Sequence, residues 1–277
     1  MKFYQKDFGQ GIFITGDLVK KIKSPFQKIA IFDSEFFGRV LAIDGNFQLS
    51  QKDEFIYHEP MAHIPFIFRN NIKNTLAIGA GDGCLVRELL KHKSLEGIVI
   101  CDLDRAIVDL SAKYLTGINQ DVLKNKKVRV NIGDGFEFLQ KENERYDLIF
   151  MDITDPCSNT MDLFSEESFS MIKKSLVRKG LLVLYAGAPL LVPDFCRQVQ
   201  NNLKKVFKFK QTYINYIPVF GTVVSFAVCS QTNIVHPVTK AIDKKLIAEK
   251  IKGLKYYSGR THRAMFSIPP YLIPILD

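Results

Sequence analysis

The sequence has few of the features that mark exported, membrane-spanning or metal-binding proteins. Its five cysteines are scattered without a CxxC pair, and several lie in apolar runs typical of strands. This pattern favours reduced thiols over a disulfide framework or a zinc site. No apolar run approaches the roughly 20 residues of a bilayer span, and the first ten residues lack the apolar stretch of a signal peptide. We therefore expect a cytoplasmic protein with no membrane partner and no metal.

A compact basic block is also missing, although the formal net charge is +9. The lysines are spread over several segments rather than gathered in one block with interleaved aromatic residues, which is typical of a solvated surface. We therefore expect no nucleic-acid partner. With 277 residues, 47% hydrophobic and 24% charged, the chain can bury one large core or two cores of unequal size.

Two patterns divide the chain. Up to residue 70, apolar and polar residues alternate between Gly and Asp turn signals, which predicts a small antiparallel β unit. From residue 71, short apolar runs alternate with helical patterns, which predicts βαβ units and a parallel sheet. Residues 207–230 resemble two further strands, an antiparallel pair at the sheet edge. The predicted fold is α/β: an N-terminal antiparallel β domain over 1–70, and a Rossmann-like, doubly wound, mostly parallel sheet of the class I methyltransferase type over 71–277.

Acidic residues follow the first four predicted strands of the parallel sheet. The carboxyl ends of such strands are where open α/β folds bind ligands. Surface acids that cap the following helices are the ordinary alternative. The residues are Asp82 in the glycine turn 79–83, Asp102 and Asp104 after the second strand, Asp134 and Gly135 after the third, and Asp152 and Asp155 after the fourth.

These acids define the ligand that we expect. Asp82 is unfavourable beside a pyrophosphate, so a dinucleotide is disfavoured. Asp102 and Asp104 stand where an acid can bind both hydroxyls of an adenosine ribose, and Asp134 can face an adenine amino group. A rim of carboxylates favours a cationic ligand, either a nucleoside with a positive sulfonium and an amine tail or a polyamine.

Several segments in fixed order resemble the aminopropyltransferases of the spermidine synthase type. The resemblance spans nearly the whole chain, and ordinary methyltransferases lack its first segment. The segments are "FGRVLAIDGNFQLSQKDEFIYHEPMAH", "LAIGAGDGCLVRE", "DLDRAIVDLSAKYL", "GDGFEFL", "YDLIFMDITDPCSNTMDLF" and "LKYYSGRTHRAMFSIP".

The resemblance implies an enzyme that moves the aminopropyl group of decarboxylated S-adenosylmethionine onto an amine such as putrescine and releases methylthioadenosine. The donor is a co-substrate, so no cofactor is implied, and the expected assembly is a homodimer or homotetramer. The resemblance places donor contacts on Gln27, Gln48, Asp82, Asp102, Asp134 and Gly135, acceptor contacts on Tyr57, His58 and Asp155, and the catalytic base on Asp152.

The expected chemistry agrees with these residue types. An alkylammonium, with a pKa of about 10, must lose a proton before it is a nucleophile, and a carboxylate such as Asp152 can take that proton. Methylthioadenosine leaves as a neutral molecule, so no acid catalyst or metal is required. Two alternatives stay open: a methyltransferase that uses intact S-adenosylmethionine, and a catalytically silent polyamine- or nucleoside-binding relative. For Tyr57 and His58 themselves, the ordinary alternative is a packed aromatic residue and a histidine on a helix surface.

The chain departs from the family pattern at four places. Ala80 replaces a glycine in the glycine turn, and Asp102 replaces the usual glutamate beside the ribose. Ser158 and Asn159 replace Gly-Pro in the loop after Asp155. The segment "IPVF" lacks a tyrosine that the family has near the acceptor, so we expect acceptor selectivity to differ from that of a tyrosine-bearing relative.

Overall fold

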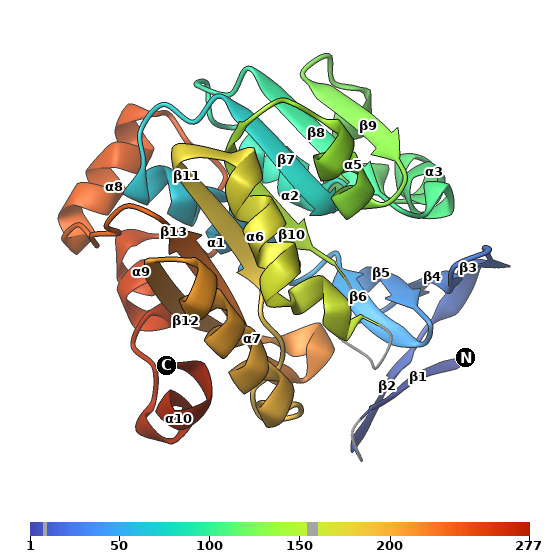
Figure 1. Ribbon diagram of the computed structural model, residues 1–277. Coiled ribbons are helices and arrows are strands. Elements are labelled where there is room, and N and C mark those ends of the chain that lie inside the picture. Colours follow the sequence, from blue (N-terminus) through green and yellow to red (C-terminus); the bar gives the residue numbers. More distant parts are fainter. Residues whose placement is uncertain (8–9, 154–159) are drawn as a thin grey trace.

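The computed structural model describes every residue except 8–9 and 154–159. A small β region at the N-terminus is followed by a larger sheet with helices on both faces (Figure 1). The strands are β1 (Lys2–Asp7), β2 (Gln10–Thr15), β3 (Asp17–Lys23), β4 (Lys28–Ser34), β5 (Gly38–Ile43), β6 (Asn46–Ser50), β7 (Asn74–Gly79), β8 (Gly97–Asp102), β9 (Val128–Ile132), β10 (Tyr146–Asp152), β11 (Leu176–Tyr185), β12 (Phe209–Ile217) and β13 (Thr222–Ser230).

Helices connect most strands of the larger sheet. The α-helices are α1 (Phe55–Phe68), α2 (Cys84–Leu89), α3 (Arg105–Tyr114), α4 (Thr116–Asn119), α5 (Gly135–Lys141), α6 (Glu166–Ser175), α7 (Pro193–Val206), α8 (Thr239–Ala248), α9 (Gly259–Met265) and α10 (Ile273–Leu276). Short 3-10 turns are η1 (Val122–Lys124), η2 (Met161–Phe164), η3 (Pro218–Phe220) and η4 (Pro270–Leu272). In the described part of the chain, no helix combines the length and apolarity needed to cross a membrane.

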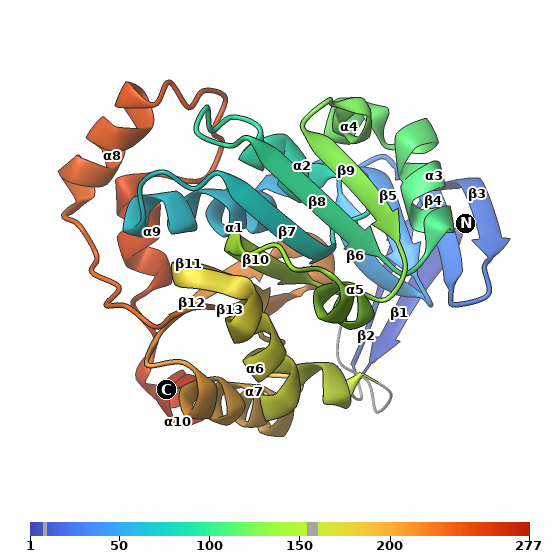
Figure 2. The same ribbon diagram turned by 45° about the horizontal axis from the view of Figure 1, so that its top comes forward.

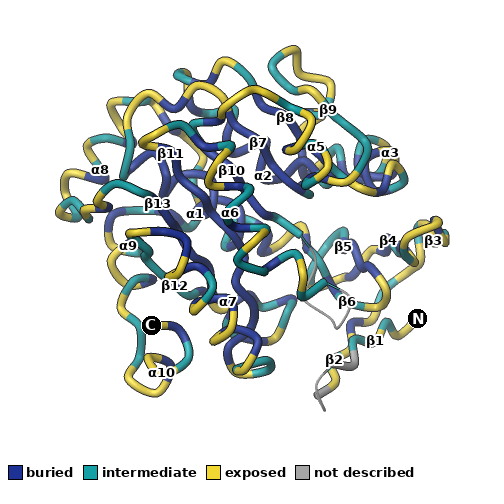
Figure 3. Tube along the Cα trace, in the orientation of Figure 1, coloured by how far each residue is buried: buried dark blue, intermediate teal, exposed yellow. Residues whose placement is uncertain are grey.

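The N-terminal region contains two antiparallel sheets. One is the hairpin β1–β2, and the other is the four-stranded meander β3-β4-β5-β6. The outer strand β3 is largely exposed, whereas β5 is largely buried (Figure 3). Lysines along an exposed strand discourage edge-to-edge pairing, and β3 carries Lys20, Lys21 and Lys23. The predicted antiparallel β unit is confirmed.

The larger sheet has seven strands in the order β12-β13-β11-β10-β7-β8-β9. The five strands from β11 to β9 are parallel, and β12 and β13 form an antiparallel pair at one edge. The mostly parallel, doubly wound fold and its antiparallel edge pair are therefore confirmed. The strand order reverses between β7 and β10, which lie side by side at the centre of the sheet (Figure 2). A ligand crevice is expected at the carboxyl ends of these two strands.

Hydrophobic clusters cover both faces of the sheet. One cluster joins the sheet to α1, α2, α8 and α9, and the other joins it to α5, α6, α7 and α10. A third cluster packs Ile31 and Leu41 of the N-terminal meander against Ile107 and Leu110 of α3. The meander therefore lies against the helix that follows β8, close to the carboxyl ends of the parallel strands.

Helix α1 departs from the prediction of β structure for the whole chain up to residue 70. Its segment "FIYHEPMAHIPFIF" is apolar on every side and contains Pro60 and Pro65, which conceals the helical period. Proline cannot donate to the carbonyl one turn earlier, so Pro60 leaves the carbonyl of Ile56 without its helical donor. The Asn215 side chain of β12 donates to that carbonyl at 2.9 Å. Tertiary packing thus stabilises a helix that the local sequence disguises.

Candidate active site

A cavity of about 260 Å³ lies at the carboxyl ends of β7, β8, β9 and β10 and reaches the N-terminal meander. Its lining mixes apolar side chains of the meander with the acids that follow the strands. The structure brings together every predicted site residue that it describes. These residues are Gln27, Gln48, Tyr57, His58, Asp82, Asp102, Asp134, Gly135 and Asp152. Asp155 and the substituted loop residues Ser158 and Asn159 lie outside the described residues.

The glycine turn after β7 forms the floor of the cavity. Gly79 has φ 85°, and a Cβ atom there would meet the Asp152 carbonyl oxygen at 2.0 Å. At Gly81 a Cβ atom would meet the Asp102 Oδ2 atom at 2.4 Å. Both glycines therefore permit backbone approaches that a side chain would block. Ala80 also lies in the left-handed region, at φ 63°, so its methyl group constrains the turn without preventing it.

Asp102 is oriented by two backbone donors. The Gly81 amide donates to Oδ2 at 3.1 Å, and the Asp104 amide donates to Oδ1 at 2.9 Å. Burial raises the pKa of Asp102 to about 6, and the nearby charges of Asp82 and Asp104 add to the increase, although the two hydrogen bonds oppose it. A partly buried carboxylate in this place gains from neutral hydroxyl donors, which stabilise its charge.

Asp104 has a different environment from Asp102. Its Oδ1 atom accepts from the Ala106 amide at the start of α3, and Oδ2 accepts from the Ser24 hydroxyl at 2.6 Å and the Gln27 side-chain amide at 2.9 Å. The helix-cap interpretation therefore applies to Asp104, which also fixes Gln27 at the cavity wall. Asp134 caps α5 through the Phe136 amide while lining the same cavity.

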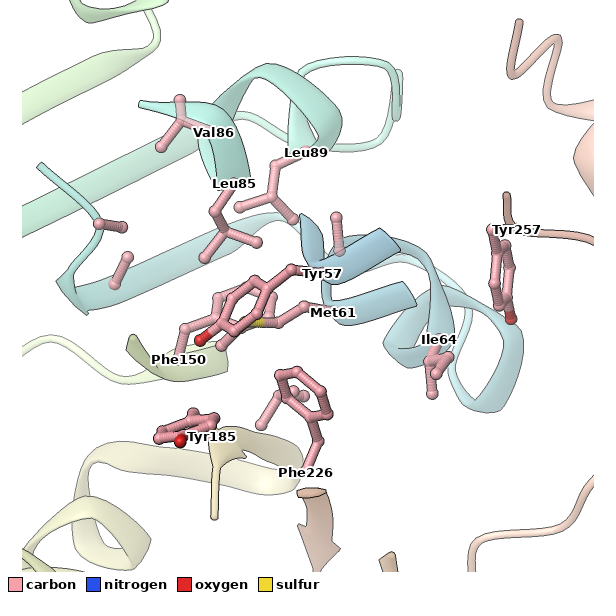
Figure 4. Packing of buried hydrophobic residues seen from close by; sticks show 14 of the residues in the cluster. Tyr57, Met61, Ile64, Leu85, Val86, Leu89, Phe150, Tyr185, Phe226 and Tyr257 are labelled. Atoms are coloured by element: carbon pink, nitrogen blue, oxygen red, sulfur yellow. The ribbon is translucent and has the colours of Figure 1, made fainter. Parts of the chain in front are cut away.

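Asp152 is the carboxylate at the centre of the site. The Tyr57 hydroxyl donates to Asp152 Oδ1 at 2.8 Å. Burial and the charge of Asp82 raise the pKa of Asp152 to about 6, while His58 and the Tyr57 hydrogen bond oppose this shift. The Tyr57 ring packs against Phe226, 4.9 Å between centroids, and near Tyr185 (Figure 4). These aromatic contacts hold the hydroxyl on the carboxylate.

His58 is buried, so the alternative of a histidine on a helix surface is wrong. Its Nδ1 atom lies 2.8 Å from the Glu54 carbonyl oxygen and 3.0 Å from Glu54 Oε2. Burial alone would lower the pKa of His58, but the hydrogen bond to Glu54 and the charges of Asp82, Glu54 and Asp152 raise it to about 9. Side-chain atoms of His58, Asp82 and Asp152 lie within 4.8 Å of one another. One histidine and two carboxylates thus meet at one point of the cavity.

The sequence did not single out Asp53 and Glu54, which precede α1. Asp53 Oδ2 accepts from the backbone amide of Val219 at 2.7 Å, and this fastens η3, whose Phe220 lines the cavity. Glu54 accepts from Arg87 at 2.9 Å as well as contacting His58. In "QKDEF" the two acids have the pattern of surface charges, and no local signal reveals partners so far along the chain.

Two family models match the chain. The spermine/spermidine synthase domain matches residues 54–239, and the spermidine synthase tetramerisation domain matches residues 5–51. The chain is 34% identical to the polyamine aminopropyltransferase of Buchnera aphidicola subsp. Schizaphis graminum, with 97% of this chain and 94% of that protein covered. It is 35% identical to the polyamine aminopropyltransferase of Leptospira biflexa, with 91% and 88% covered.

Solved structures agree with these sequence matches. Spermidine synthase from Thermotoga maritima has a TM-score of 0.90 and 28% identity, with all of this chain and 94% of that chain covered. A spermidine synthase in complex with the transition-state analogue AdoDATO has a TM-score of 0.89 and 27% identity over the same shares. The family predicted from the motifs is confirmed, and the chain belongs to the spermine/spermidine synthase family of polyamine aminopropyltransferases.

Proposed function

We propose that this chain transfers the aminopropyl group of decarboxylated S-adenosylmethionine to an amine such as putrescine and releases methylthioadenosine. The observation that carries the proposal is the partly buried pair in which Tyr57 donates to Asp152, beside Asp82 and His58 in the cavity. A carboxylate with a raised pKa, held by a neutral donor, is suited to take a proton from an ammonium group.

The donor is proposed to occupy the half of the cavity between the glycine turn and α5. Asp102 accepts from the ribose hydroxyls, and Asp134 and Gly135 face the adenine. Gln27 and Gln48 complete this wall, and Asp82 attracts the ammonium at the end of the aminopropyl chain. The donor is consumed in each turnover, so it is a co-substrate, and we assign no resident cofactor or metal to the site.

The acceptor is proposed to lie along Tyr57, His58 and Asp155. Asp152 removes a proton from the acceptor ammonium, and the resulting amine nitrogen attacks the carbon bonded to the sulfonium. A carbon–nitrogen bond forms while the carbon–sulfur bond breaks, and its electron pair remains on sulfur, which leaves as neutral methylthioadenosine. Alignment of two bound reactants is worth up to about 7–11 kcal/mol in favourable cases, so orientation supplies much of the acceleration.

We also propose an oligomeric state and a cellular location for the enzyme. Residues 5–51 match a tetramerisation domain, which supports an oligomer, and we propose a homodimer or homotetramer assembled through the N-terminal domain, residues 1–70, with the catalytic domain at 71–277. We propose a cytoplasmic location, which the buried thiols of Cys84, Cys101 and Cys229 support because such groups persist in a reducing compartment. No nucleic-acid or membrane partner is proposed.

Replacement of the base tests the proposal. Asp152→Asn should retain methylthioadenosine binding while turnover falls by roughly two to four orders of magnitude, the usual effect of losing a general base. Asp109→Asn, which removes an exposed carboxylate of α3, is the matched control and should keep its turnover. Products from decarboxylated donor and a mixed panel of amines are identified by mass spectrometry. Near-normal turnover of Asp152→Asn would remove Asp152 as the base, and methyl transfer from S-adenosylmethionine would overturn the proposed reaction.

A further inference from the structure

The hydrogen bonds of His58 determine where its protons lie. Nδ1 faces a backbone carbonyl oxygen and a carboxylate oxygen, both from Glu54. A carbonyl oxygen can only accept, so Nδ1 carries a hydrogen and donates it. Nε2 is therefore the nitrogen that remains for the cavity, which His58 lines.

The charges around His58 favour a second proton on that ring. Asp82 comes from the turn after β7 and Asp152 from β10, and both belong to the cluster within 4.8 Å. Glu54 contributes a further negative charge from the start of α1. Helix α2 supplies Arg87, whose guanidinium lies 2.9 Å from Glu54 Oε2, the same oxygen that His58 Nδ1 contacts. The thiol of Cys84, also on α2, has its pKa raised well above the usual value by burial and by Asp82, so it stays neutral.

Glu54 keeps its charge despite burial. Burial alone would raise the pKa of Glu54, but its hydrogen bonds and charge interactions with His58 and Arg87 lower it. In the free enzyme the imidazolium of His58 thus stands between one carboxylate that positions it and two carboxylates of the site. A carboxylate brought close to another carboxylate is costly unless a cation separates them.

We propose that the imidazolium of His58 is the resident counter-ion of Asp82 and Asp152, and that donor binding expels its Nε2 proton, with Glu54 as the positioning residue for this exchange. The inference rests on the proposed function, because the sulfonium and ammonium of the donor are the cations that replace the imidazolium. The bond that breaks is Nε2–H, and the proton passes to solvent. The hydrogen on Nδ1 stays in place and continues to be donated to Glu54. The freed lone pair of Nε2 becomes an acceptor for an amine.

The exchange avoids two unfavourable states. An empty site without a cation would leave the carboxylates to repel one another, and a loaded site with a charged His58 would oppose two substrate cations. A histidine can avoid both states, because it is charged in the empty site and loses its charge with one proton when the donor binds, whereas lysine or arginine would keep its charge. The acidic site therefore stays balanced both before and after the donor enters.

Proton release on binding tests the inference. Calorimetric titration with decarboxylated S-adenosylmethionine, without an amine acceptor, is run at pH 8 in buffers of different ionisation enthalpy. A group with a pKa of about 9 holds about 0.9 proton at pH 8, whereas groups with a pKa of about 6 hold about 0.01. We expect close to one proton released per site. Methylthioadenosine is the matched ligand without the cations, and it should release almost none.

Three variants assign the proton to its source. His58→Gln should bind the donor without release, and Glu54→Gln should reduce the release to less than half. Glu88→Gln is the control, because Glu88 is buried and accepts from Arg87 at 3.0 Å without lying among the groups around His58, and its release should match the wild type. A purely structural Glu54 would lower Tm in Glu54→Gln and leave the release unchanged.

The failures of the two proposals are distinguishable. Donor binding by the wild type with no more release than methylthioadenosine would overturn the counter-ion exchange and leave the aminopropyltransferase proposal standing. Release of about one proton by His58→Gln would likewise overturn the exchange alone. If the decarboxylated donor does not bind to the wild type at all, both proposals fail. The wild-type measurement decides even if a variant does not fold.

Discussion

The hydrogen bond between Tyr57 and Asp152 provides a test of how the base is tuned. Tyr57→Phe removes only the hydroxyl that donates to Asp152 Oδ1 at 2.8 Å. This bond stabilises the ionised carboxylate, and burial raises the pKa of Tyr57 well above its usual value, so the hydroxyl remains a donor throughout the working range. Its loss should therefore raise the pKa of Asp152. The acidic limb of the pH profile of kcat/KM, which reports the free enzyme, should move to higher pH.

The size of the shift follows from the strength of the bond. A hydrogen bond to a charged group contributes roughly 1.5–3 kcal/mol, and one pKa unit corresponds to about 1.4 kcal/mol, so we expect a rise of about one to two units. From a starting pKa of about 6, the active fraction at pH 7 falls from about 0.9 to between about 0.5 and 0.1. Turnover at low substrate should drop about two- to tenfold at pH 7 through protonation alone, and should recover near pH 9.

The assay is the pH dependence of kcat/KM for the amine, measured by release of methylthioadenosine in wild type and Tyr57→Phe. Methylthioadenosine affinity serves as the control, because the ring of Phe at this position keeps the packing against Phe226. An acidic limb that stays in place while activity falls equally at every pH would show that Tyr57 contributes through substrate alignment, and the reasoning about the pKa of Asp152 would be refuted.

Other predictions concern selectivity. Because the carboxylate of S-adenosylmethionine would approach Asp82, decarboxylated donor should bind at least about tenfold more tightly, about 1.4 kcal/mol, and equal affinities would contradict this. Phe220→Tyr adds a hydroxyl at the cavity wall and should steepen the kcat/KM ratio between putrescine and cadaverine; an unchanged ratio would mean that this segment does not read the acceptor. Gly81→Ala should displace the Asp102 carboxylate and weaken methylthioadenosine binding about tenfold or more, while Gly117→Ala, where a Cβ meets nothing within 4 Å, should not; similar affinities would count against the proposed ribose contact.

The sequence predicted the central fold well because its signals are local. Each parallel strand is a short apolar run next to a helical pattern, and this alternation was sufficient to predict the doubly wound sheet and its antiparallel edge. Helix α1 was missed because Pro60 and an all-round apolar composition hide its period, while Asn215 supplies the missing donor from β12. That bond joins residues 159 positions apart, so no sequence window contains it.

The site was predictable where a strand end delivers a side chain to the cavity. Asp82, Asp102 and Asp152 follow this rule, and topology alone brings them together. The partners that orient site residues lie far from them in the sequence. Gln27 donates to Asp104, which is 77 positions away, and Arg87 donates to Glu54, which is 33 positions away. Such pairs depend on how the meander and α2 dock on the sheet, which the pattern of each segment does not encode. The roles of all these residues stay predictions, and Asp155 also lies outside the described residues.

The anchor at Asp53 has a consequence for how acceptor preference can diverge within this architecture. Asp53 accepts a hydrogen bond from the backbone amide of Val219 in η3, so this anchor does not depend on which side chains η3 carries. Phe220, one position later, faces the cavity from that fixed support. Substitutions of Phe220 can therefore change the wall of the cavity while η3 keeps its position, which makes residue 220 a suitable position for libraries screened for a changed preference among amines. Val219→Pro would remove the amide that donates to Asp53, so position 219 cannot be varied in the same way.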